Sequence, residues 1–564
     1  MYKVVEMFSG IGSQARALRN LGFNEEVVGT CEWDIHAIIA YDLIHNSPEI
    51  PADILLMDKE KLLEKLKLFT FSNSGKEALD FDSLRTYSLD SLRRIYCSIT
   101  RNKNFVDIST LSGSNMPESI DILTYSFPCQ DLSNVGVFHG YNKGIDIDSG
   151  SRSSLLWQVG RILEEMRSSG KHLPRFLLME NVPTLLSDRH FPNFSKWIND
   201  LKKLGYISKY YQLNASSFGL PQNRPRLLMI SVWVGDNLDL AELVLDYFRQ
   251  KNEDAIVNDY KSSKFYHEYS VQDLLRTDYT NCELFEEACE STPNDTVSRK
   301  KIWDENPQIV QEGYILNKDI NVVRTITTKQ DRNPNSGNLY FESGIKGKGN
   351  FRYLTPRECM LFMGFTDDDY QSLKDNNIEF HKGDALFARD KIIRMAGNSI
   401  PVKLLEGVFY QIWLIDKLLE DYRRIYGDQP MDKAEREKSI KHIKSFLFSQ
   451  GIRCRDTSRE YPEEADIAYS KYNSLVYIQD CRYHWHSCMS GSLPSINKEL
   501  WEARFADVRN KDDAIYRKAM DMGWNVIVVW SCALDSENEM QELAKIIVSN
   551  KHKGAKVKGV IEIG

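Results

Sequence analysis

Apolar residues in the first half of the chain occur in short runs that are separated by segments of helical periodicity. The runs are rich in Val, Ile, Leu and Phe, and they predict buried strands at Lys3–Phe8, Glu26–Glu32, Ser119–Tyr125, Arg175–Glu180 and Arg226–Val234. Strands that alternate with helices are typical of a doubly wound, mostly parallel sheet with helices on both faces. The pattern therefore predicts an α/β fold.

Polar stretches interrupt this pattern and indicate where domains begin and end. A long polar insertion covers about residues 45–104, and residues 236–350 are more polar and irregular than the segments around them. The charged segment Arg423–Lys438 contains Gly-Asp-Gln-Pro, which is typical of a linker. We expect a catalytic domain over residues 1–235 that returns over 351–422, a small domain over 236–350, a linker over 423–431 and a further α/β domain over 432–564.

The composition excludes several classes of protein. With 42% hydrophobic and 27% charged residues, the chain is similar to ordinary globular proteins. No apolar run approaches the roughly 20 residues that a membrane-spanning helix needs. The ten cysteines are scattered, which favours a reducing compartment. A net charge of −8 argues against a nucleic-acid coat protein but allows a local basic cleft. From the lengths of the apolar runs and the scattered cysteines together, we expect a cytoplasmic protein with no membrane partner.

A glycine-containing turn, FSGIG, follows the first predicted strand. Its Gly10 and Gly12 would let a ligand approach the backbone near a helix N-terminus. Glu32 ends the second strand about 20 residues further on, where a carboxylate can bind ribose hydroxyls. Asp107 follows the insertion and could accept a hydrogen bond from an adenine amino group. These positions favour a nucleoside-type cofactor at the carboxyl ends of the strands; the alternative is a tight turn with solvated acids nearby.

A cysteine and a glutamate follow the next two predicted strands. Cys129 comes directly after Pro128, which cannot extend a strand and so places the thiol on a loop at the ligand edge of the sheet. Glu180 ends the following strand and is expected to face the same crevice. A thiolate can add to an electron-poor ring while a carboxyl group donates a hydrogen bond or a proton to a ring nitrogen. The alternative for Cys129 is a small buried hydrophobic residue.

Seven blocks of sequence occur in the order found in DNA (cytosine-5)-methyltransferases, which the chain resembles over about residues 1–420. The blocks are FSGIG, EWD, SFPCQDLS, MENV, QNRPR, RYLTPRECMLFMGF and AGNSIPVKLLE. The resemblance implies the fold of S-adenosylmethionine-dependent methyltransferases, with a small target-recognition domain. Two departures from the family are Met395, where glutamine is usual, and the insertion before Asp107, on one side of the cofactor pocket.

The resemblance assigns roles to residues of these blocks. It implies that Cys129 attacks cytosine C6 and that Glu180 contacts N3 and the exocyclic amine of a base flipped out of the duplex. Asn181 would hold the Glu180 loop, and Arg224 and Arg226 would brace the base and the adjacent phosphate. The implied cofactor is S-adenosyl-L-methionine, and the implied pocket residues are Phe8, Gly10, Gly12, Glu32, Trp33, Asp107, Asn398 and Ser399.

Two parts of this assignment keep a structural alternative. Trp33 would stack on adenine or would be a core tryptophan at a strand end. Residues 236–350 take the place of the family's target-recognition region, and their basic and polar stretch Val323–Gly337 would read base edges in the major groove or would be a solvated loop.

The C-terminal part of the chain has its own arrangement of cysteine and histidine. Cys481, His486 and Cys488 have the spacing C-x4-H-x-C, and Cys532 follows a predicted strand. Such residues can close a tetrahedral structural zinc site; the alternative is buried thiols and solvated histidines. The sequence over about residues 432–540 resembles the very-short-patch-repair endonuclease, which nicks DNA beside T:G mismatches, and that family's zinc ligands match these residues. The resemblance implies an α/β restriction-endonuclease-like domain with structural Zn²⁺.

The catalytic residues of that endonuclease family are only partly retained. Asp466 matches the metal-binding aspartate and would hold Mg²⁺, with His484 beside it, if the domain were active. Gln479 replaces a second active-site histidine and cannot carry a proton near neutral pH. The family's helix acid falls at Ile440, which is not an acid. The family's pair of aromatic residues that wedges into DNA falls at Arg482 and Tyr483, so only one aromatic residue of the pair is retained.

The sequence therefore supports two classes of function. In the first, a DNA (cytosine-5)-methyltransferase carries a zinc-containing, nuclease-like domain that is weak or inactive in cleavage. In the second, the chain is a bifunctional methyltransferase and endonuclease that nicks mismatches or restricts unmodified DNA. Gln479 favours the first class, while Asp466 and His484 keep the second open. Both classes act on double-stranded DNA, and we expect a monomer.

Overall fold

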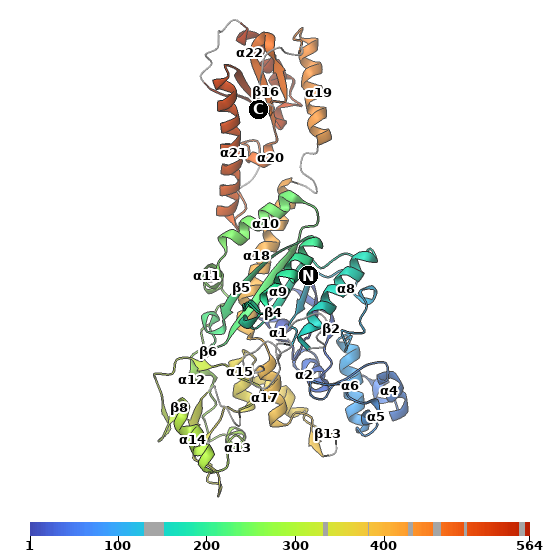
Figure 1. Ribbon diagram of the computed structural model, residues 1–564, viewed down its shortest axis with the longest axis vertical. Coiled ribbons are helices and arrows are strands. Elements are labelled where there is room, and N and C mark those ends of the chain that lie inside the picture. Colours follow the sequence, from blue (N-terminus) through green and yellow to red (C-terminus); the bar gives the residue numbers. More distant parts are fainter. Residues whose placement is uncertain are drawn as a thin grey trace. The chain divides into compact units, whose positions relative to one another are not determined.

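The structure is a computed structural model of the chain and consists of two compact units. It describes residues 1–128, 152–330, 337–381, 383–426, 433–454, 464–489, 493–551 and 559–564. The first unit is Met1–Ile412 and the second is Trp413–Gly564. Each unit has its own sheet (Figure 1).

In the described part of the first unit, the central sheet has six strands in the order β2-β1-β3-β4-β7-β5. Their bounds are β1 (Tyr2–Met7), β2 (Glu25–Cys31), β3 (Ile122–Tyr125), β4 (Phe176–Asn181), β5 (Tyr206–Asn214) and β7 (Pro225–Trp233). Neighbours from β2 to β4 are parallel, whereas β7 is antiparallel to both β4 and β5. The sheet is therefore mixed, with β7 reversed relative to the other described strands. The five predicted strands are confirmed, each within a few residues, as β1, β2, β3, β4 and β7.

Strand β5 is present although no apolar run indicated it. It lies at one edge of the sheet and pairs with β7. An edge strand is partly exposed, so Lys209 and Gln212 face water while Tyr211 and Leu213 are buried. This mixture of polar and apolar residues is the reason that the pattern of buried runs did not reveal the strand.

Helices cover the sheet and fill the insertion. Their bounds are α1 (Ser13–Asn20), α2 (Ile35–His45), α3 (Ala52–Leu55), α4 (Lys59–Leu66), α5 (Phe81–Leu84), α6 (Leu89–Arg101), α8 (Leu156–Ser168) and α9 (Phe191–Lys203). On one face of the sheet, Val5 and Leu177 pack with Leu163 of α8 and Trp197 of α9. The adjacent Val4 is equally buried on the other face. Burial on both faces explains why these strands are nearly continuous apolar runs.

The polar insertion at about residues 45–104 is largely helical and is anchored to α2. Asp42 of α2 is fully buried and accepts hydrogen bonds from Arg101 (3.0 Å) and from Ser98 (3.1 Å), both on α6. A buried carboxylate is costly unless it is paired and hydrogen-bonded. Asp42 thus fixes the insertion against the body of the first unit.

Residues 236–350 contain further helices and short strands. The helices are α10 (Leu238–Gln250), α11 (Glu253–Lys261), α12 (Val271–Leu274), α13 (Cys282–Glu290) and α14 (Val297–Glu305). The strands are β8 (Gln308–Gln311), β9 (Ile315–Leu316), β10 (Val323–Arg324) and β11 (Asn338–Tyr340). With β12 (Phe351–Arg352), three of these strands form a small sheet in the order β12-β11-β8-β9, and β10 pairs with β6 (Gln222–Asn223).

The chain then returns to the body of the first unit. The elements of this part are α15 (Pro356–Phe362), α16 (Asp367–Asp375), β13 (Glu379–His381), β14 (Asp384–Ala385), α17 (Arg389–Asn398) and α18 (Val402–Tyr426). A fully buried ion pair lies where this part begins: Arg352 Nη1 is 2.7 Å from Glu358 Oε2. Glu358 also accepts hydrogen bonds from the backbone N–H groups of Thr355 and Arg276.

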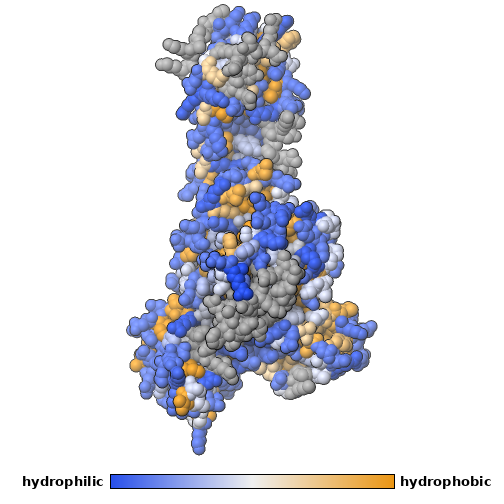
Figure 2. All heavy atoms as spheres, viewed as in Figure 1, coloured by the Kyte–Doolittle hydropathy of each residue, from blue (hydrophilic) through white to orange (hydrophobic). Residues whose placement is uncertain are grey.

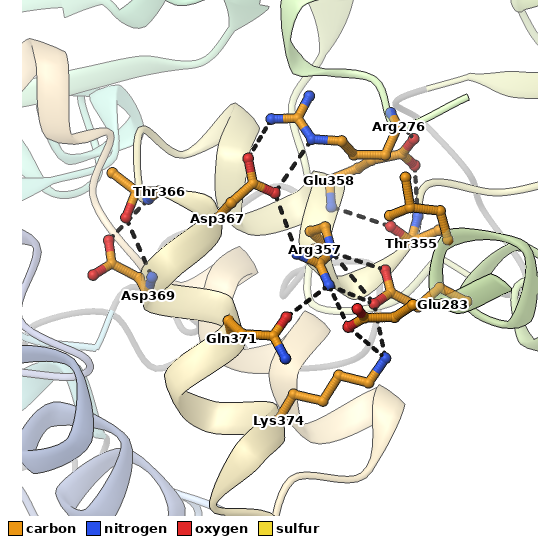
Figure 3. A network of polar contacts seen from close by, with 12 residues as sticks. Arg276, Glu283, Thr355, Arg357, Glu358, Thr366, Asp367, Asp369, Gln371 and Lys374 are labelled. Atoms are coloured by element: carbon orange, nitrogen blue, oxygen red, sulfur yellow. Dashed lines mark hydrogen bonds and ion pairs between the residues drawn. The ribbon is translucent and has the colours of Figure 1, made fainter. Parts of the chain in front are cut away.

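Arg357 extends this arrangement into a network of charged groups (Figure 3). Its guanidinium donates to Glu287 of α13, Asp367 of α16 and Gln371 of α16. Lys374, one turn further along α16, pairs with Glu287 and with Glu283. The network connects the helices of residues 236–350 to the part of the chain that returns to the sheet.

The second unit is a smaller α/β structure. Its elements are α19 (Lys433–Ser449), β15 (Ile467–Tyr469), β16 (Ser474–Gln479), α20 (Cys481–His484), α21 (Lys498–Asp521), β17 (Asn525–Trp530), α22 (Glu537–Asn550) and β18 (Ile561–Ile563). The strands have the order β15-β16-β17-β18, with β15 antiparallel to β16 and the others parallel. Ile443 of α19 and Leu543 of α22 pack on one face with Val476, and Tyr516 of α21 packs on the other face with Val528.

The end of α18 packs within the second unit. The Tyr426 ring lies 4.6 Å from the Tyr483 ring and 6.3 Å from the Trp501 ring, measured between centroids. The Asn497 side chain donates a hydrogen bond to the carbonyl of Leu414. These contacts explain why the second compact unit begins at Trp413 rather than after α18.

Among the described helices, none is both long enough and apolar enough to cross a membrane. Hydrophilic residues dominate the face seen in Figure 2, and hydrophobic residues occur there in small groups. Exposed apolar residues among those described include Leu56, Leu238 and Val297.

We predict that Glu358→Gln destabilises the first unit strongly. The substitution leaves the Arg352 guanidinium buried without a carboxylate, which typically costs about 3–5 kcal/mol of unfolding free energy. Denaturant unfolding of the variant measures the loss. Glu305→Gln is the matched control, because its partner Lys301 is exposed and the pair is 3.6 Å apart. Equal stability of the two variants would show that the buried pair is not a structural anchor.

Candidate active site

A cavity of about 480 Å³ opens at the carboxyl ends of β1, β2, β3 and β4. The site residues expected from the sequence that line this cavity are Phe8, Gly10, Glu32, Trp33, Asp107, Glu180, Arg224, Arg226, Asn398 and Ser399. Parallel strands bring their carboxyl ends to the same edge of a sheet, so residues far apart in the sequence meet there. Cys129 lies outside the described residues, but Pro128, directly before it, lines the cavity.

The glycine turn has a backbone that other residues rarely adopt. Gly10 and Gly12 have positive φ values of 54° and 80°. A Cβ at Gly12 would lie 2.2 Å from the His45 ring of α2, so a side chain does not fit there. Gly12 therefore acts by letting α1 start close to α2, whereas Gly10 lines the cavity.

Glu32 is held by the backbone at the end of β2. One carboxylate oxygen accepts from the N–H of Gly10 at 3.0 Å, and the other accepts from the N–H groups of Trp33 and Asp34, each at 2.9 Å. Burial raises the pKa of the Glu32 carboxyl to about 7, and the nearby Asp34 carboxylate adds to this rise. The backbone donors oppose the rise, so Glu32 is a fixed acceptor on the cavity wall.

A segment of the insertion, residues 70–79, forms part of the same wall, through Thr70, Gly75 and Ala78. This 70–79 loop is tied to the end of β2, because Ser72 accepts from the N–H of Ile35 and its own N–H donates to the carbonyl of Trp33. Sequence reasoning placed the insertion beside the pocket without assigning any of its residues to the site. No local motif marks them, because their place on the wall arises from contacts with the residues that follow β2.

Arg394 of α17 closes this side of the cavity. Its guanidinium is 2.8 Å from the Asp34 carboxylate and donates to the carbonyl of Asn73 in the 70–79 loop at 3.3 Å. Arg394 thereby joins α17, the end of β2 and the insertion. It also lines the cavity, and its position just before the AGNSIPVKLLE block is the sequence signal that points to it.

Glu180 and Asn181 lie together at the end of β4. Glu180 Oε1 is 2.8 Å from Arg226 Nε, and each side chain is 12% exposed. Burial raises the pKa of the Glu180 carboxyl, although the Arg226 and Arg224 guanidiniums counteract it. The Asn181 side chain donates to the carbonyl of Phe127 at 3.1 Å and so holds the backbone shortly before Cys129.

Arg224 holds three separate segments together. It is 2% exposed, and its guanidinium donates to the carbonyls of Ile326, Gly397 and Ser399 at 2.7 to 2.8 Å. These acceptors belong to the residues 236–350 region and to the end of α17. The sequence assigned Arg224 to contacts with DNA, and the structure adds this buried role in positioning the cavity wall.

The second unit brings together the cysteines and the histidine that the sequence singled out. The ligand atoms of Cys481, His486, Cys488 and Cys532 all lie within 4.8 Å of one another. The His486 ring stacks on Trp530 with 4.3 Å between centroids. Thiolates and imidazole are the ligands that soft and borderline metal ions prefer. This cluster could therefore bind a metal ion.

The nuclease-type residues of the second unit also lie near one another, each with a partner. Asp466 pairs with Arg436 of α19, at 2.7 Å. His484 Nε2 is 2.5 Å from Asp512 Oδ2, and Gln479 donates to the Tyr516 hydroxyl at 2.7 Å. None of the sequence motifs described above includes Arg436 or Asp512. Ile440, the expected position of the helix acid, packs against the core instead.

Comparison with known families decides what the first unit is. A family model described as C-5 cytosine-specific DNA methylase matches residues 89–413, which is more than half of the chain. The chain belongs to the C-5 cytosine-specific DNA methylase family. It is 30% identical over 414 residues to the orphan methyltransferase M.SssI of Spiroplasma monobiae, covering 73% of this chain and 97% of that protein. It is 31% identical over 421 residues to the type II methyltransferase M2.ScrFI of Lactococcus lactis subsp. cremoris, covering 73% of this chain and 99% of that protein.

The second unit of this methylase matches a different family. The model described as DNA mismatch endonuclease Vsr matches residues 430–490. The type II nicking enzyme V.NmeAIP of Neisseria meningitidis is 34% identical over 95 residues, covering 17% of this chain and 68% of that protein. The methylase therefore carries a Vsr-like domain, and both expected resemblances are confirmed. Because both families act on DNA, DNA is the substrate class of this chain.

We predict that Arg224→Lys lowers the thermal midpoint of the methylase unit more than Arg226→Lys does. A lysine cannot reproduce the fixed fork of donors that binds three carbonyls, and hydrogen bonds to charged groups are worth about 1.5–3 kcal/mol each. At position 226 a lysine still reaches the Glu180 carboxylate. Thermal unfolding of the two variants tests this, and equal midpoints would contradict the positioning role of Arg224.

Proposed function

We propose that this methylase transfers a methyl group to C5 of a flipped cytosine within a specific DNA sequence, through a covalent bond between Cys129 and C6. The observation that carries the proposal is the position of Glu180. A carboxyl group with a raised pKa faces the same cavity as the glycine turn and Glu32, next to the segment that leads to Cys129. We assign residues 236–350 to recognition of the DNA sequence, flanked by the catalytic parts over 1–235 and 351–422.

The cavity fits S-adenosyl-L-methionine as the methyl donor, which supplies an electrophilic methyl group when bound. To bind this cofactor, a site needs a hydrogen-bond acceptor for the ribose hydroxyls, a flat apolar surface for the adenine ring and a backbone without side chains near the methionine part. Glu32, Trp33 and Gly10 offer these groups on one wall. Phe8, Asp107, Asn398 and Ser399 complete our assignment of the pocket. The family to which the chain belongs supports this cofactor.

The residues of this chain would perform the reaction as follows. The Cys129 thiolate would form a bond to C6, which makes C5 nucleophilic toward the methyl group. After methylation a base such as a water molecule takes the C5 proton, the electron pair re-forms the C5–C6 double bond, and the thiolate leaves. A protonated Glu180 donates a hydrogen bond to N3, and a raised pKa favours the protonated form. Arg226 holds Glu180, and Asn181 holds the backbone before Cys129. The base must leave the duplex, at a cost of a few kcal/mol.

For the Vsr-like domain, over about residues 432–564, we propose a structural zinc ion and weak or absent cleavage. Cys481, His486, Cys488 and Cys532 would provide all the ligands, which leaves no position for water and describes a closed site. The second candidate function is a bifunctional methyltransferase and nicking or restriction endonuclease. It is favoured by the contact between His484 and Asp512, because a carboxylate can orient a histidine that transfers protons.

We predict that Cys129→Ala abolishes methyl transfer and leaves cofactor binding intact, because the thiol bonds to the base only along the reaction path. Glu180→Gln should slow transfer by about 10²–10⁴-fold, the usual worth of general acid catalysis. Incorporation of labelled methyl groups and calorimetric titration with the cofactor measure both properties. Methyl transfer by Cys129→Ala at a rate comparable to that of the wild type would refute the assignment of Cys129.

We also predict that the wild type forms a denaturation-resistant complex with DNA that contains 5-fluorocytosine.

We further predict that the purified chain contains stoichiometric zinc and that Cys481→Ser removes it. Structural zinc contributes folding free energy, so the variant should lose the unfolding transition of the second unit. Methyl transfer should persist, because the methylase cavity is built from residues of the first unit. Cys454→Ser is the matched control, since Cys454 is a cysteine of the same unit outside the cluster. Metal analysis that finds no zinc in the wild type would exclude the structural site.

A further inference from the structure

In the Vsr-like domain, the carboxylate expected to bind a metal ion already holds a cation from the chain itself. Arg436 Nε is 2.7 Å from one oxygen of Asp466, and Arg436 Nη2 is 3.1 Å from the other. The backbone N–H of Ile478 donates to the second oxygen at 2.7 Å. The Asp466 side chain is 6% exposed, so the chain itself provides most of its surroundings.

The periodicity of α19 explains why an arginine reaches this carboxylate. Residues 436, 440, 443 and 447 lie on one face of the helix, because they are three or four positions apart. Ile443 and Leu447 are buried in the core of the domain, and Ile440 packs against that core. Arg436 is therefore at the first turn of this face, and its side chain, which is 46% exposed, reaches Asp466, the residue directly before β15. The face that would provide an acid in the endonuclease family provides a guanidinium here.

The groups around Asp466 do not fit a divalent cation such as Mg²⁺. Mg²⁺ needs oxygen ligands in near-octahedral geometry at about 2.0–2.1 Å, and it usually takes one or two carboxylates and several waters. Both Asp466 oxygens are already bound to Arg436, and a metal ion at that position would meet the positive guanidinium. Asp512 is also engaged, since it contacts His484 Nε2 at 2.5 Å.

The other polar groups of this centre are engaged in the same way. Gln479 donates to the Tyr516 hydroxyl, and His484 Nδ1 contacts the carbonyl of Asp480 at 3.0 Å. The hydrogen bond to Asp466 raises the pKa of Arg436, and the nearby Asp512 and Tyr516 act in the same direction. The guanidinium thus remains charged and lies beside the residues that a metal ion would serve.

We propose that the Arg436 guanidinium occupies the position of the divalent cation, so that the Vsr-like domain of this methylase binds no Mg²⁺ at Asp466 and does not cleave DNA. This goes beyond the proposed methyl transfer and names a cause of inactivity other than Gln479. Restoring a histidine at position 479 is therefore insufficient, because the centre still lacks its metal ion. Two changes are needed, one at Arg436 and one at Gln479.

Metal binding provides the first test and needs no activity. Titration of the zinc-loaded full chain with Mn²⁺, followed by electron paramagnetic resonance, should show an additional site in Arg436→Ala that the wild type lacks. The site should disappear in Arg436→Ala/Asp466→Asn. Lys441→Ala, an exposed lysine of α19, is the control that removes a positive charge elsewhere and should gain no site. Arg436→Gln, which keeps donor groups without the charge, is a second variant if the alanine variant unfolds.

Two outcomes of this titration would overturn the proposal. One is the absence of an additional Mn²⁺ site in both folded Arg436 variants. The other is a loss of Mn²⁺ binding when Asp466→Asn is introduced into the wild type, since Asp466 would then hold the metal ion despite Arg436. Methyl transfer is measured on the same samples, so a failure of the proposed methylase chemistry is recognised separately.

Cleavage of a T:G duplex in the presence of Mn²⁺ provides the second test. The wild type and Gln479→His should give no product. Arg436→Ala/Gln479→His should nick the duplex, and its rate should exceed that of Arg436→Ala alone by about 10²-fold or more, which is the lower range for a restored proton-transfer step. Nicking by Gln479→His alone that is lost with Asp466→Asn would overturn the proposal.

Discussion

The parallel pairing of β2, β1, β3 and β4 is the constraint on which the methylase site depends. Parallel strands have their carboxyl ends at one edge of the sheet, and each βα connection places a turn there. The glycine turn after β1, Glu32 after β2, Pro128 after β3 and Glu180 on β4 therefore line one cavity. No residue needs to be near another in the sequence for this to happen. The reversed strand β7 then brings Arg224 and Arg226 to the same edge.

Pairing of buried charges does the rest of the positioning. Arg394 joins α17 to the end of β2 through Asp34, Arg224 ties three backbone segments, and Arg352 pairs with Glu358 where the chain returns to the sheet. A buried charge without a partner is far more costly than the pair, so each arginine admits few arrangements of the segments that it joins. The contacts of Arg394 and Arg224 thus define the cavity wall together with the strands.

The same physical rule has a different consequence in the Vsr-like domain. There the pairing of Asp466 with Arg436 satisfies a buried carboxylate without a metal ion. A domain can then keep its fold, its cysteine cluster and most of its nuclease-type residues while one substitution on a helix face changes the charge of its centre. Family membership describes this second unit, whereas the chemistry of its centre depends on individual contacts such as that of Arg436 with Asp466.

The sequence by itself determined the elements and motifs that depend on neighbours along the chain. Runs of apolar residues predicted five strands, and the FSGIG motif predicted a glycine turn after the first of them, because these signals are local. The seven ordered blocks indicated the family, because their residues match those of its members in the same order. Only the tertiary structure showed the edge strand β5, the 70–79 loop on the cavity wall, the three acceptors of Arg224 and the contact of Arg436 with Asp466. Each of these depends on which segments meet in space, and residue type and periodicity do not specify the partner of a charged side chain that lies tens or hundreds of positions away.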